Sequence, residues 1–296
     1  MLDYAALSAL SAVIAEGSFE RAALSLGLTP SAISQRVKGL EDRLGAVLVV
    51  RGQPCTATPP GRRLIAHLAR VRLLEAGLTP ALTGLAAPPT IGLAVNADSL
   101  ATWFPAAAAR FGAESGALLS LTLDDEAHTA GRLRNGEVLA AITSVAAPVP
   151  GCKTTPLGAL RYAACASPAF MAREFPHGVT QAALAQAPHL RFDRRDNLQS
   201  LWAQAAHGQP LTGPSHFVPS TQGFLDLTLH GLAWGVHPVA LVAPHLATGR
   251  LTELPPAHRI EVHLYWTVAR LHSAVLAKLT RAVLSAARTL APPESA

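Results

Sequence analysis

The chain has 296 residues, half of them apolar, with a net charge of +5 and an isoelectric point near 9.6. This length suggests about two domains with packed cores, and no apolar stretch is long enough to span a bilayer. The three cysteines have no ligand or redox spacing, so we expect reduced thiols in a cytoplasmic protein. The first 89 residues, with nine basic and six acidic side chains, are the more basic segment, which favours contact with phosphates.

Three short helices are predicted at the N-terminus. The first spans Tyr4–Glu16 and turns its apolar side chains inward. Ser18 is expected to cap the second helix, and Gly27 can take the left-handed conformation that ends it. Thr29 then caps the third helix, with Pro30 at its first position, where a missing amide proton costs nothing.

The third helix has two faces of opposite character. Apolar residues at intervals of three and four predict one buried seam, formed by Ile33, Val37, Leu40 and Leu44. The other side carries hydroxyls, an amide and cations, which can contact base edges and phosphates from a major groove, as in a helix-turn-helix. An ordinary solvated helix face is the alternative. The candidate DNA-contacting residues are Ser31, Ser34, Gln35, Arg36 and Lys38.

A strand near Val47–Val49 and a hairpin-like return over Arg51–Thr58 follow, and Gly45 is expected to end the helix before them. Arg51 is a candidate for a phosphate contact, with an exposed turn residue as an equal alternative. A long helix is predicted from Thr58 to about Gly84. Its apolar seam, which a helix outside a small domain cannot bury alone, predicts pairing with a second copy through Leu64, Leu68, Val71, Leu74 and Leu78.

The remainder of the chain is predicted to be a two-lobed α/β domain, joined to the long helix by a hinge at Gly84–Thr90. In the first half, strands alternate with helices in a parallel βαβ pattern: strands 91–95, 118–123 and 138–143, helices 101–111 and 130–135. The second half repeats the alternation: strands 162–166, 189–192, near 216–218, 233–236, 251–253 and 260–268, helices 168–174, 181–185, 198–207, 222–230 and 274–290. Crossovers near Leu160 and His263 would resemble the periplasmic-binding-protein fold, in which a ligand lies between the halves.

Two loops of the first half are candidate ligand sites. The segment Asn96–Leu100 joins a strand to a helix, and Ser99 near the cap, with the amide of Leu100 behind it, could bind a carboxylate. Asp124, Asp125 and Glu126 follow a strand end and could pair with a cationic side chain. A plain N-cap and a solvated turn are the respective alternatives, and a metal site at the acids is the weaker interpretation.

Further candidates lie at other strand and helix ends. Thr143 ends a strand of the first half, and Ser220, Thr221 and Gln222 start a helix of the second half that could cap a carboxylate from the other side. No nucleophile–base pair, phosphate-binding loop or metal motif is found, so we expect no catalytic residue, no metal and no cofactor.

The sequence AALSLGLTPSAISQRVKGLEDRLG resembles the DNA-binding segment of LysR-type transcriptional regulators, and LVVRGQPCTATPPGRRL takes the place of that family's wing and linker helix. The segments NADSLATWFP, DDEAHT and LYW resemble the lysine- and arginine-sensing branch, which controls basic amino acid export. That branch often has an acid where Gln222 stands here. The resemblance covers essentially the whole chain and implies an operator, a basic amino acid effector and a homodimer, with a tetramer left open.

The sequence therefore predicts a winged helix-turn-helix at 1–58, a linker and dimerisation helix with hinge at 59–89, and an effector-binding domain at 90–296. Lobe I is expected over about 90–160 and 267–296, and lobe II over about 161–266.

The predicted function is a cytoplasmic LysR-type regulator, not an enzyme, that senses lysine or arginine and controls an exporter gene. The alternatives are a LysR-type regulator of another effector, a transporter's solute-binding protein and a small-molecule enzyme. The missing signal-peptide cations disfavour a solute-binding protein, and the absence of a catalytic pattern disfavours an enzyme.

Overall fold

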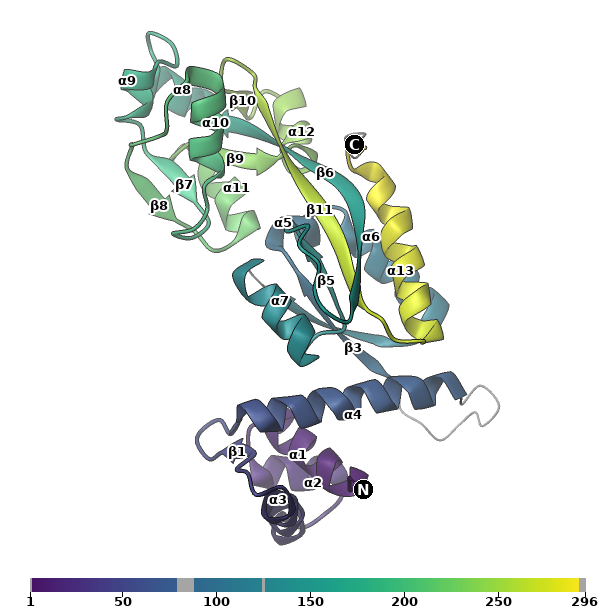
Figure 1. Ribbon diagram of the computed structural model, residues 1–296. Helices are drawn as coiled ribbons and strands as arrows, with labels where there is room; N and C mark the ends of the chain where they lie inside the picture. The colour runs from purple at the N-terminus through teal and green to yellow at the C-terminus, as the bar shows by residue number, and fades with distance from the viewer. Residues whose placement is uncertain (1, 79–87, 124–125, 293–296) are drawn as a thin grey trace.

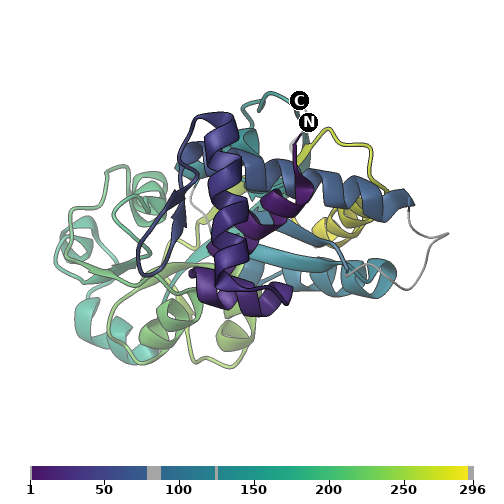
Figure 2. The same ribbon diagram turned by 90° about the horizontal axis from the view of Figure 1, so that it is seen from below.

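The computed structural model describes residues 2–78, 88–123 and 126–292. Figure 1 shows a small helical domain, a long helix and a two-lobed α/β domain in chain order. In Figure 2, which views the molecule from below, the helical domain and the long helix lie in front of the α/β domain. Within the described ranges no helix has the length and apolar character needed to cross a membrane.

The N-terminal domain is built from three helices: α1 (Tyr4–Glu16), α2 (Phe19–Leu26) and α3 (Pro30–Leu44). The predicted caps are confirmed, because the Ser18 and Thr29 side chains each accept an amide of the turn that follows. Gly27 and Gly45 end α2 and α3 with φ angles of 63° and 62°, where a side chain would be strained. The local sequence signals therefore set the ends of these helices.

The buried seam of α3 is shorter than predicted. Ile33, Val37 and Leu40 are buried against α1 and α2, as expected. Leu44 is 45% exposed, so its assignment to the seam was wrong. The physical reason is its place as the last residue of α3, where the chain turns away through Gly45.

Two short strands, β1 (Val49–Val50) and β2 (Thr56–Ala57), pair antiparallel after α3, which confirms the hairpin-like return. The predicted strand at 47–49 began two residues early. Glu41 holds the hairpin to α3, because its Oε1 accepts the amides of Leu48 at 2.7 Å and Val49 at 3.3 Å. No local pattern marked Glu41, since this contact joins residues seven and eight positions apart.

The long helix α4 (Pro59–Leu78) is buried on two sides. Leu68 packs into the core of the N-terminal domain, whereas Leu73 packs into the core of the α/β domain. The assumption that no other part of the chain covers the predicted seam was therefore wrong for Leu68. Leu74 remains 41% exposed, so part of the seam is still uncovered. The predicted helix end at Gly84 lies outside the described residues.

One seven-stranded sheet runs through the α/β domain, in the order β10-β6-β11-β5-β3-β4, with β9 paired to β6. In lobe I, β3 (Thr90–Val95) pairs in parallel with β4 (Leu118–Leu123) and β5 (Ala140–Thr143). Its helices, which lie around these strands in Figure 1, are α5 (Ala97–Ala101), α6 (Phe104–Ser115), α7 (Glu126–Asn135) and α13 (Ala274–Ala286). The parallel βαβ prediction is confirmed for this lobe.

Two long antiparallel strands connect the lobes: β6 (Cys152–Ala166) and β11 (Arg259–Ala269). The predicted crossover segments pair with each other, with Leu160 opposite Val262 and His263 opposite Ala159. The sequence placed the start of β6 at 162, ten residues late, because Pro156 and Gly158 interrupt the strand pattern. A register shift between Leu264 and Tyr265 accommodates the irregular pairing opposite this stretch.

Lobe II surrounds the far ends of these strands. Its helices are α8 (Pro168–Glu174), α9 (Gln181–Leu184), α10 (Leu198–His207), α11 (Thr221–Leu229) and α12 (Val239–Ala247). Its other strands are β7 (His189–Arg191), β8 (Ser215–Phe217), β9 (Gly235–Pro238) and β10 (Thr252–Glu253), with β7 parallel to β8. Strand β9 lies two residues later than the predicted 233–236.

The C-terminal helix ends earlier than predicted. Helix α13 stops at Ala286, and a 3-10 turn over Ala287–Thr289 continues to one residue before the predicted end at Leu290. All three cysteines are buried free thiols, and burial raises the pKa of Cys165 to about 12. A thiol with such a pKa stays protonated at neutral pH and is therefore a poor nucleophile.

Candidate functional sites

The outer face of α3 is a solvent-exposed polar surface. Ser31, Gln35 and Lys38 are exposed, and their side chains make no hydrogen bond or ion pair to any described residue. Arg36 is also exposed, and Ser34 is half-buried at the edge of the face. A helix that is anchored by its buried seam and has free donors on the opposite side can present them to a DNA groove.

Arg51 lies beside this helix in a defined orientation. Its guanidinium carbon is 5.2 Å from the centre of the Phe19 ring, at the start of α2. Stacking on an aromatic face leaves the edge of the guanidinium available for a phosphate. Arg51 is therefore held on the domain surface rather than extended freely into solvent.

The predicted start of the helix after β3 is wrong. The sequence placed it at 101, with Ser99 near the cap, but α5 begins at Ala97 and Asn96 is the cap, whose Oδ1 accepts the amide of Ser99 at 2.8 Å. The Leu100 amide is also used, because it donates to the Asn96 carbonyl. Ser99 itself is fully buried, and its Oγ accepts the indole N–H of Trp103 at 3.1 Å. Ser99 and Leu100 therefore help to shape this loop: the Leu100 amide is taken by Asn96, whereas the Ser99 hydroxyl accepts the Trp103 N–H and keeps its own proton to donate.

Of the other lobe I candidates, the structure describes Thr143 at the carboxyl end of β5 and Glu126 at the start of α7. Thr143 ends β5, is buried and accepts the amide of Val145 through its Oγ1 at 3.0 Å, so its hydroxyl proton remains to be donated. Asp124 and Asp125 lie outside the described residues, and Glu126 is described only as the first residue of α7. Because α5 and Thr143 both follow carboxyl ends of parallel strands, they occur where α/β folds bind ligands.

The lobe II candidates behave differently from one another. Ser220 caps α11, with its Oγ accepting the amide of Gly223. The side chain of Gln222 is exposed and bonds to Asp226 one turn later at 2.9 Å, away from the other candidates. Only Thr221 reaches across to lobe I, where its hydroxyl donates to Asp98 Oδ1 at 3.2 Å. The structure thus brings the start of α11 to α5.

Asp98 is the residue that the sequence reasoning missed. Its carboxylate accepts hydrogen bonds from Thr221 of lobe II and, at 2.8 Å, from the Tyr162 hydroxyl on β6. Burial raises the pKa of this carboxyl, and these two hydrogen bonds lower it by less. A signal was present, because Asp98 is the only charged residue between Thr90 and Ala109. Attention to carboxylate-binding donors nevertheless favoured its neighbour Ser99.

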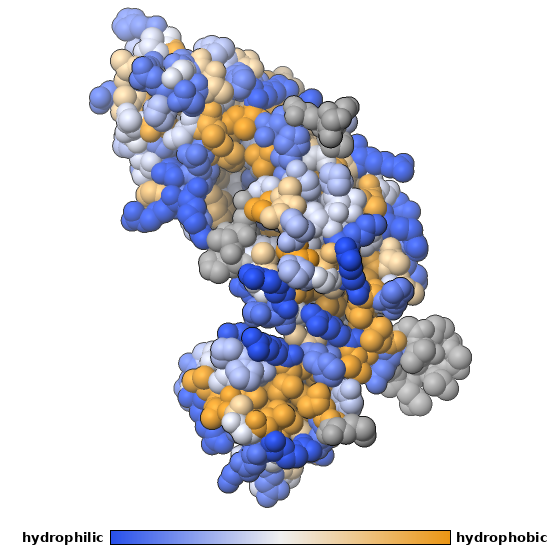
Figure 3. Space-filling model, viewed as in Figure 1, coloured by the Kyte–Doolittle hydropathy of each residue, from blue (hydrophilic) through white to orange (hydrophobic). Residues whose placement is uncertain are grey.

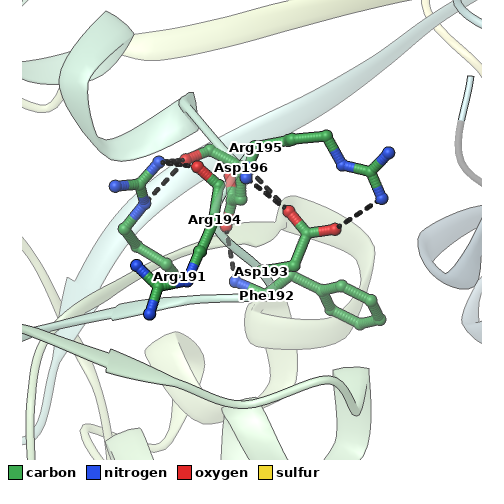
Figure 4. A network of polar contacts seen from close by, with 6 residues as sticks. All are labelled: Arg191, Phe192, Asp193, Arg194, Arg195 and Asp196. Atoms are coloured by element: carbon green, nitrogen blue, oxygen red, sulfur yellow. Dashed lines mark hydrogen bonds and ion pairs between the residues drawn. The ribbon is translucent and has the colours of Figure 1, made fainter. Parts of the chain in front are cut away.

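A loop between β7 and α10 adds charge near the same junction. Figure 4 shows that its acids are bound within the loop: Asp196 accepts the Phe192 amide at 2.8 Å and Asp193 accepts the Arg195 amide at 2.7 Å. The Arg191 guanidinium donates to the backbone carbonyl of Asp196. These bonds within the loop help to fix its conformation.

The described candidates are groups that can bind a small polar molecule. Among the residues that the structure describes, no group of three histidine, cysteine or acidic side chains is placed to hold a metal ion. The described candidates are hydroxyls, a carboxylate and helix-terminal amides drawn from both lobes. Such groups bind a small polar molecule and couple its presence to the arrangement of the lobes.

Comparison with known proteins finds two family matches in the chain. Residues 4–62 match the family of bacterial regulatory helix-turn-helix proteins of the lysR type, and residues 86–288 match the LysR substrate binding domain. The chain is 42% identical over 291 residues to the HTH-type transcriptional regulator LysG of Mycobacterium tuberculosis, covering 98% of this chain and 95% of that protein. It is 44% identical over 290 residues to the regulator ArgP of Pseudomonas aeruginosa, covering 97% and 96%.

Solved structures resemble the chain over its whole length. The crystal structure of ArgP from Mycobacterium tuberculosis has a TM-score of 0.82 and 41% identity, covering 99% of this chain and all of that one. Full-length LysG from Corynebacterium glutamicum with the bound effector Arg has a TM-score of 0.71 and 39% identity, with coverage of 99% and 100%. The similarity thus includes both the N-terminal domain and the two lobes.

Proposed function

The chain belongs to the LysR family of helix-turn-helix transcriptional regulators, and from this premise we propose that it senses lysine or arginine and controls transcription of an amino acid exporter gene. As a member of this family it is a regulator and not an enzyme. One observation supports this choice of effector: the chain is similar over its whole length to LysG from Corynebacterium glutamicum, whose structure has been solved with the effector Arg bound. A regulator that acts on an operator works where the DNA is, so we place this one in the cytoplasm.

For the DNA interface, we propose that α3 enters the major groove with Gln35 reading a base pair. Ser31, Ser34, Arg36 and Lys38 contact the bases or phosphates around it. Exposure of this face opposite a buried seam supports the assignment. The cation of Arg51, stacked on Phe19, then holds a phosphate beside the groove.

For the effector, we propose a site between the lobes, at the carboxyl ends of the lobe I strands and the start of α11. Thr143 and Thr221 supply hydroxyls there, and Ser220 sets the position of the α11 amides. The pairing of a cationic effector side chain with Asp124, Asp125 and Glu126 stays a prediction. The Ser99 hydroxyl accepts the Trp103 indole N–H and the Gln222 amide donates to Asp226, and effector contact by Ser99, Leu100 and Gln222 stays a prediction.

We also propose that the chain functions as a homodimer, with a tetramer left open. Two apolar surfaces support self-association: Leu74 on α4, and the edge strand β4, on which Leu118, Leu121 and Leu123 are exposed. Figure 3 shows a further apolar area on the N-terminal domain beneath α4. In this proposal residues 1–58 bind DNA, 59–89 link and dimerise, and 90–296 bind the effector.

The test is calorimetric titration of the full-length chain with each standard amino acid and with norleucine, an uncharged isostere of lysine. We expect lysine or arginine to bind with micromolar affinity, because two or three charge-assisted hydrogen bonds of about 1.5–3 kcal/mol each suffice for this. Norleucine binding as tightly as lysine would remove the side-chain cation as the basis of specificity. Binding of none of these compounds would leave a LysR-type regulator with a different effector.

A further inference from the structure

Asp98 lies where three structural units of the α/β domain meet. It belongs to α5 of lobe I, it accepts a hydrogen bond from Tyr162 on the connecting strand β6, and it accepts another from Thr221 at the start of α11 in lobe II. Asp98 as a whole residue is partly exposed, whereas its carboxylate is largely desolvated and accepts one hydrogen bond at each oxygen atom. A change at this carboxylate therefore acts on both lobes at once.

The carboxylate is desolvated without a charge to balance it. Both of its hydrogen-bond donors are neutral hydroxyls, and within the described ranges no lysine, arginine or histidine forms an ion pair with it. The charge of Asp196 acts on it and, like burial, raises its pKa. A desolvated carboxylate in this situation gains most from an added cation, since a paired charge is far less costly than an isolated one.

The neighbouring acids of lobe II do not share this property. Asp196 is held by the amides of Phe192 and Leu198 and by the Gln199 side chain. Asp193 is bound by the backbone and side chain of Arg195, as Figure 4 shows. Asp226 is turned toward Gln222. Among the described acids at the junction, Asp98 is the one whose partners carry neither a positive charge nor an N–H group.

The surroundings of Asp98 also match the head group of an α-amino acid. Thr221, which bonds to Asp98, is the first residue of the nine-residue helix α11, and the first turn of a helix directs amide donors outward. An α-amino acid carries an ammonium and a carboxylate on one carbon atom. A carboxylate near the α11 start would leave the ammonium beside Asp98.

We propose that Asp98 binds the α-ammonium group of the amino acid effector and thereby joins the two lobes around the effector's head group. This inference rests on the proposed function, because it requires an amino acid effector. In this arrangement the α-ammonium of the effector is paired with Asp98, and the side-chain cation is paired with other acids. Asp98 recognises what every α-amino acid shares, and the choice of a basic side chain is made elsewhere in the site.

The experiment separates the two ammonium groups of lysine. Full-length wild-type protein and the Asp98→Asn variant are titrated calorimetrically with lysine, with norleucine, which lacks the side-chain ammonium, and with 6-aminohexanoate, which lacks the α-ammonium. For ligands too weak for direct titration, displacement of bound lysine gives the affinity. Asp193→Asn serves as the matched control, since it neutralises a nearby acid that is already bound within its own loop.

We expect Asp98→Asn to lower the affinity for lysine and for norleucine by at least about tenfold, which corresponds to about 1.4 kcal/mol of binding free energy. Its affinity for 6-aminohexanoate should stay within about twofold of the wild-type value. Asp193→Asn should leave the affinities for all three ligands unchanged. The melting temperature of Asp98→Asn should equal or exceed that of the wild type, because a desolvated charge is removed, so lost binding cannot be ascribed to unfolding.

Two results would overturn the inference while leaving the proposed function intact. One is lysine affinity of Asp98→Asn within twofold of the wild type. The other is an equal loss for lysine and 6-aminohexanoate, which would assign Asp98 to the side-chain cation or to the structure of the site. Failure of the wild type to bind any amino acid would instead contradict the proposed function, and this inference with it.

Discussion

At the scale of single residues, position in the fold decides what similar side chains can do. Gln35 and Gln222 are both exposed glutamines near helix starts, but Gln222 is bonded to Asp226 whereas Gln35 makes no bond to a described residue. Asp98 and Asp193 are both acids near the lobe junction, but only Asp193 is paired with an arginine. Residue type alone therefore does not tell which of these side chains are available to a ligand.

Replacing Gln35 by alanine should reduce the free energy of operator binding by about 1–3 kcal/mol, through one base pair. The protein should then discriminate less between bases at that position. Replacing Lys38 by alanine should weaken binding to all sequences alike and reduce its salt dependence, because a phosphate contact carries no sequence information. Binding titrations on an operator and its single-base variants measure both effects. An unchanged sequence preference in both variants would contradict the assignment of this face.

The two buried histidines of lobe II should make its stability fall in acid. Burial lowers the pKa of His237 to about 3 and that of His189 to about 4, from an ordinary value of 6.5. Their contribution to stability is thus complete above pH 6.5 and is lost as the pH falls toward 4 and 3, by up to about 1.4 kcal/mol per pH unit for each.

Urea denaturation of the full-length chain between pH 7 and pH 5 measures this loss. His237→Asn should be less stable at pH 7, because its bond to Thr228 is disturbed, but should lose less on acidification. Equal pH dependence of the variant and the wild type would show that His237 does not titrate on unfolding.

At the scale of elements, the sequence correctly predicted the features that depend on residues close together in the chain. Ser18, Gly27 and Thr29 set helix ends through bonds to residues a few positions away, so the N-terminal helices were placed correctly. Strand β6 was placed late, because its pairing with β11 is between distant residues and the breakers at Pro156 and Gly158 obscured its continuity. The contact of Asp98 with Thr221 joins residues 123 positions apart, and no local pattern could reveal it.

The exposed part of α4 gives an element-scale prediction about dimerisation. Leu74→Lys places a charge on the uncovered side of the helix, so it should weaken self-association and operator binding together. Leu24→Lys, at an apolar residue that is 83% exposed on α2, is the control and should leave self-association unchanged. Sedimentation velocity across a concentration series measures both. A full-strength dimer in Leu74→Lys would exclude this face of α4 as a main interface.

At the scale of the whole molecule, α4 touches both the DNA-binding domain and lobe I. Arg62 forms an ion pair with Glu137 at 3.3 Å, just after α7. The Arg70 guanidinium also approaches Gly136 so closely that a Cβ there would lie 2.5 Å from its Nη2. Because α7 begins at Glu126, beside the predicted effector acids, a shift of this helix can be transmitted to α4.

Glu137→Gln should therefore reduce the effect of the effector on DNA affinity by a few-fold, as expected for a partly exposed ion pair worth about 0.2–1 kcal/mol. Effector affinity itself should stay within about twofold. Glu114→Gln, which breaks the similar Arg110–Glu114 pair on α6, is the control and should change neither. DNA titrations with and without lysine provide the ratio, and an unaltered ratio in Glu137→Gln would exclude this contact from the coupling.

The most direct measurement is a quantitative DNase I footprint titration of the full-length chain on an operator fragment selected from genomic DNA, without ligand and with lysine, arginine or norleucine. A ligand changes DNA binding only through different affinities for two arrangements of the protein. We predict that lysine or arginine at millimolar concentration shifts the half-saturation point or the boundaries of the footprint, and that norleucine does not. A footprint identical in all four conditions would contradict the claim that this regulator senses a basic amino acid.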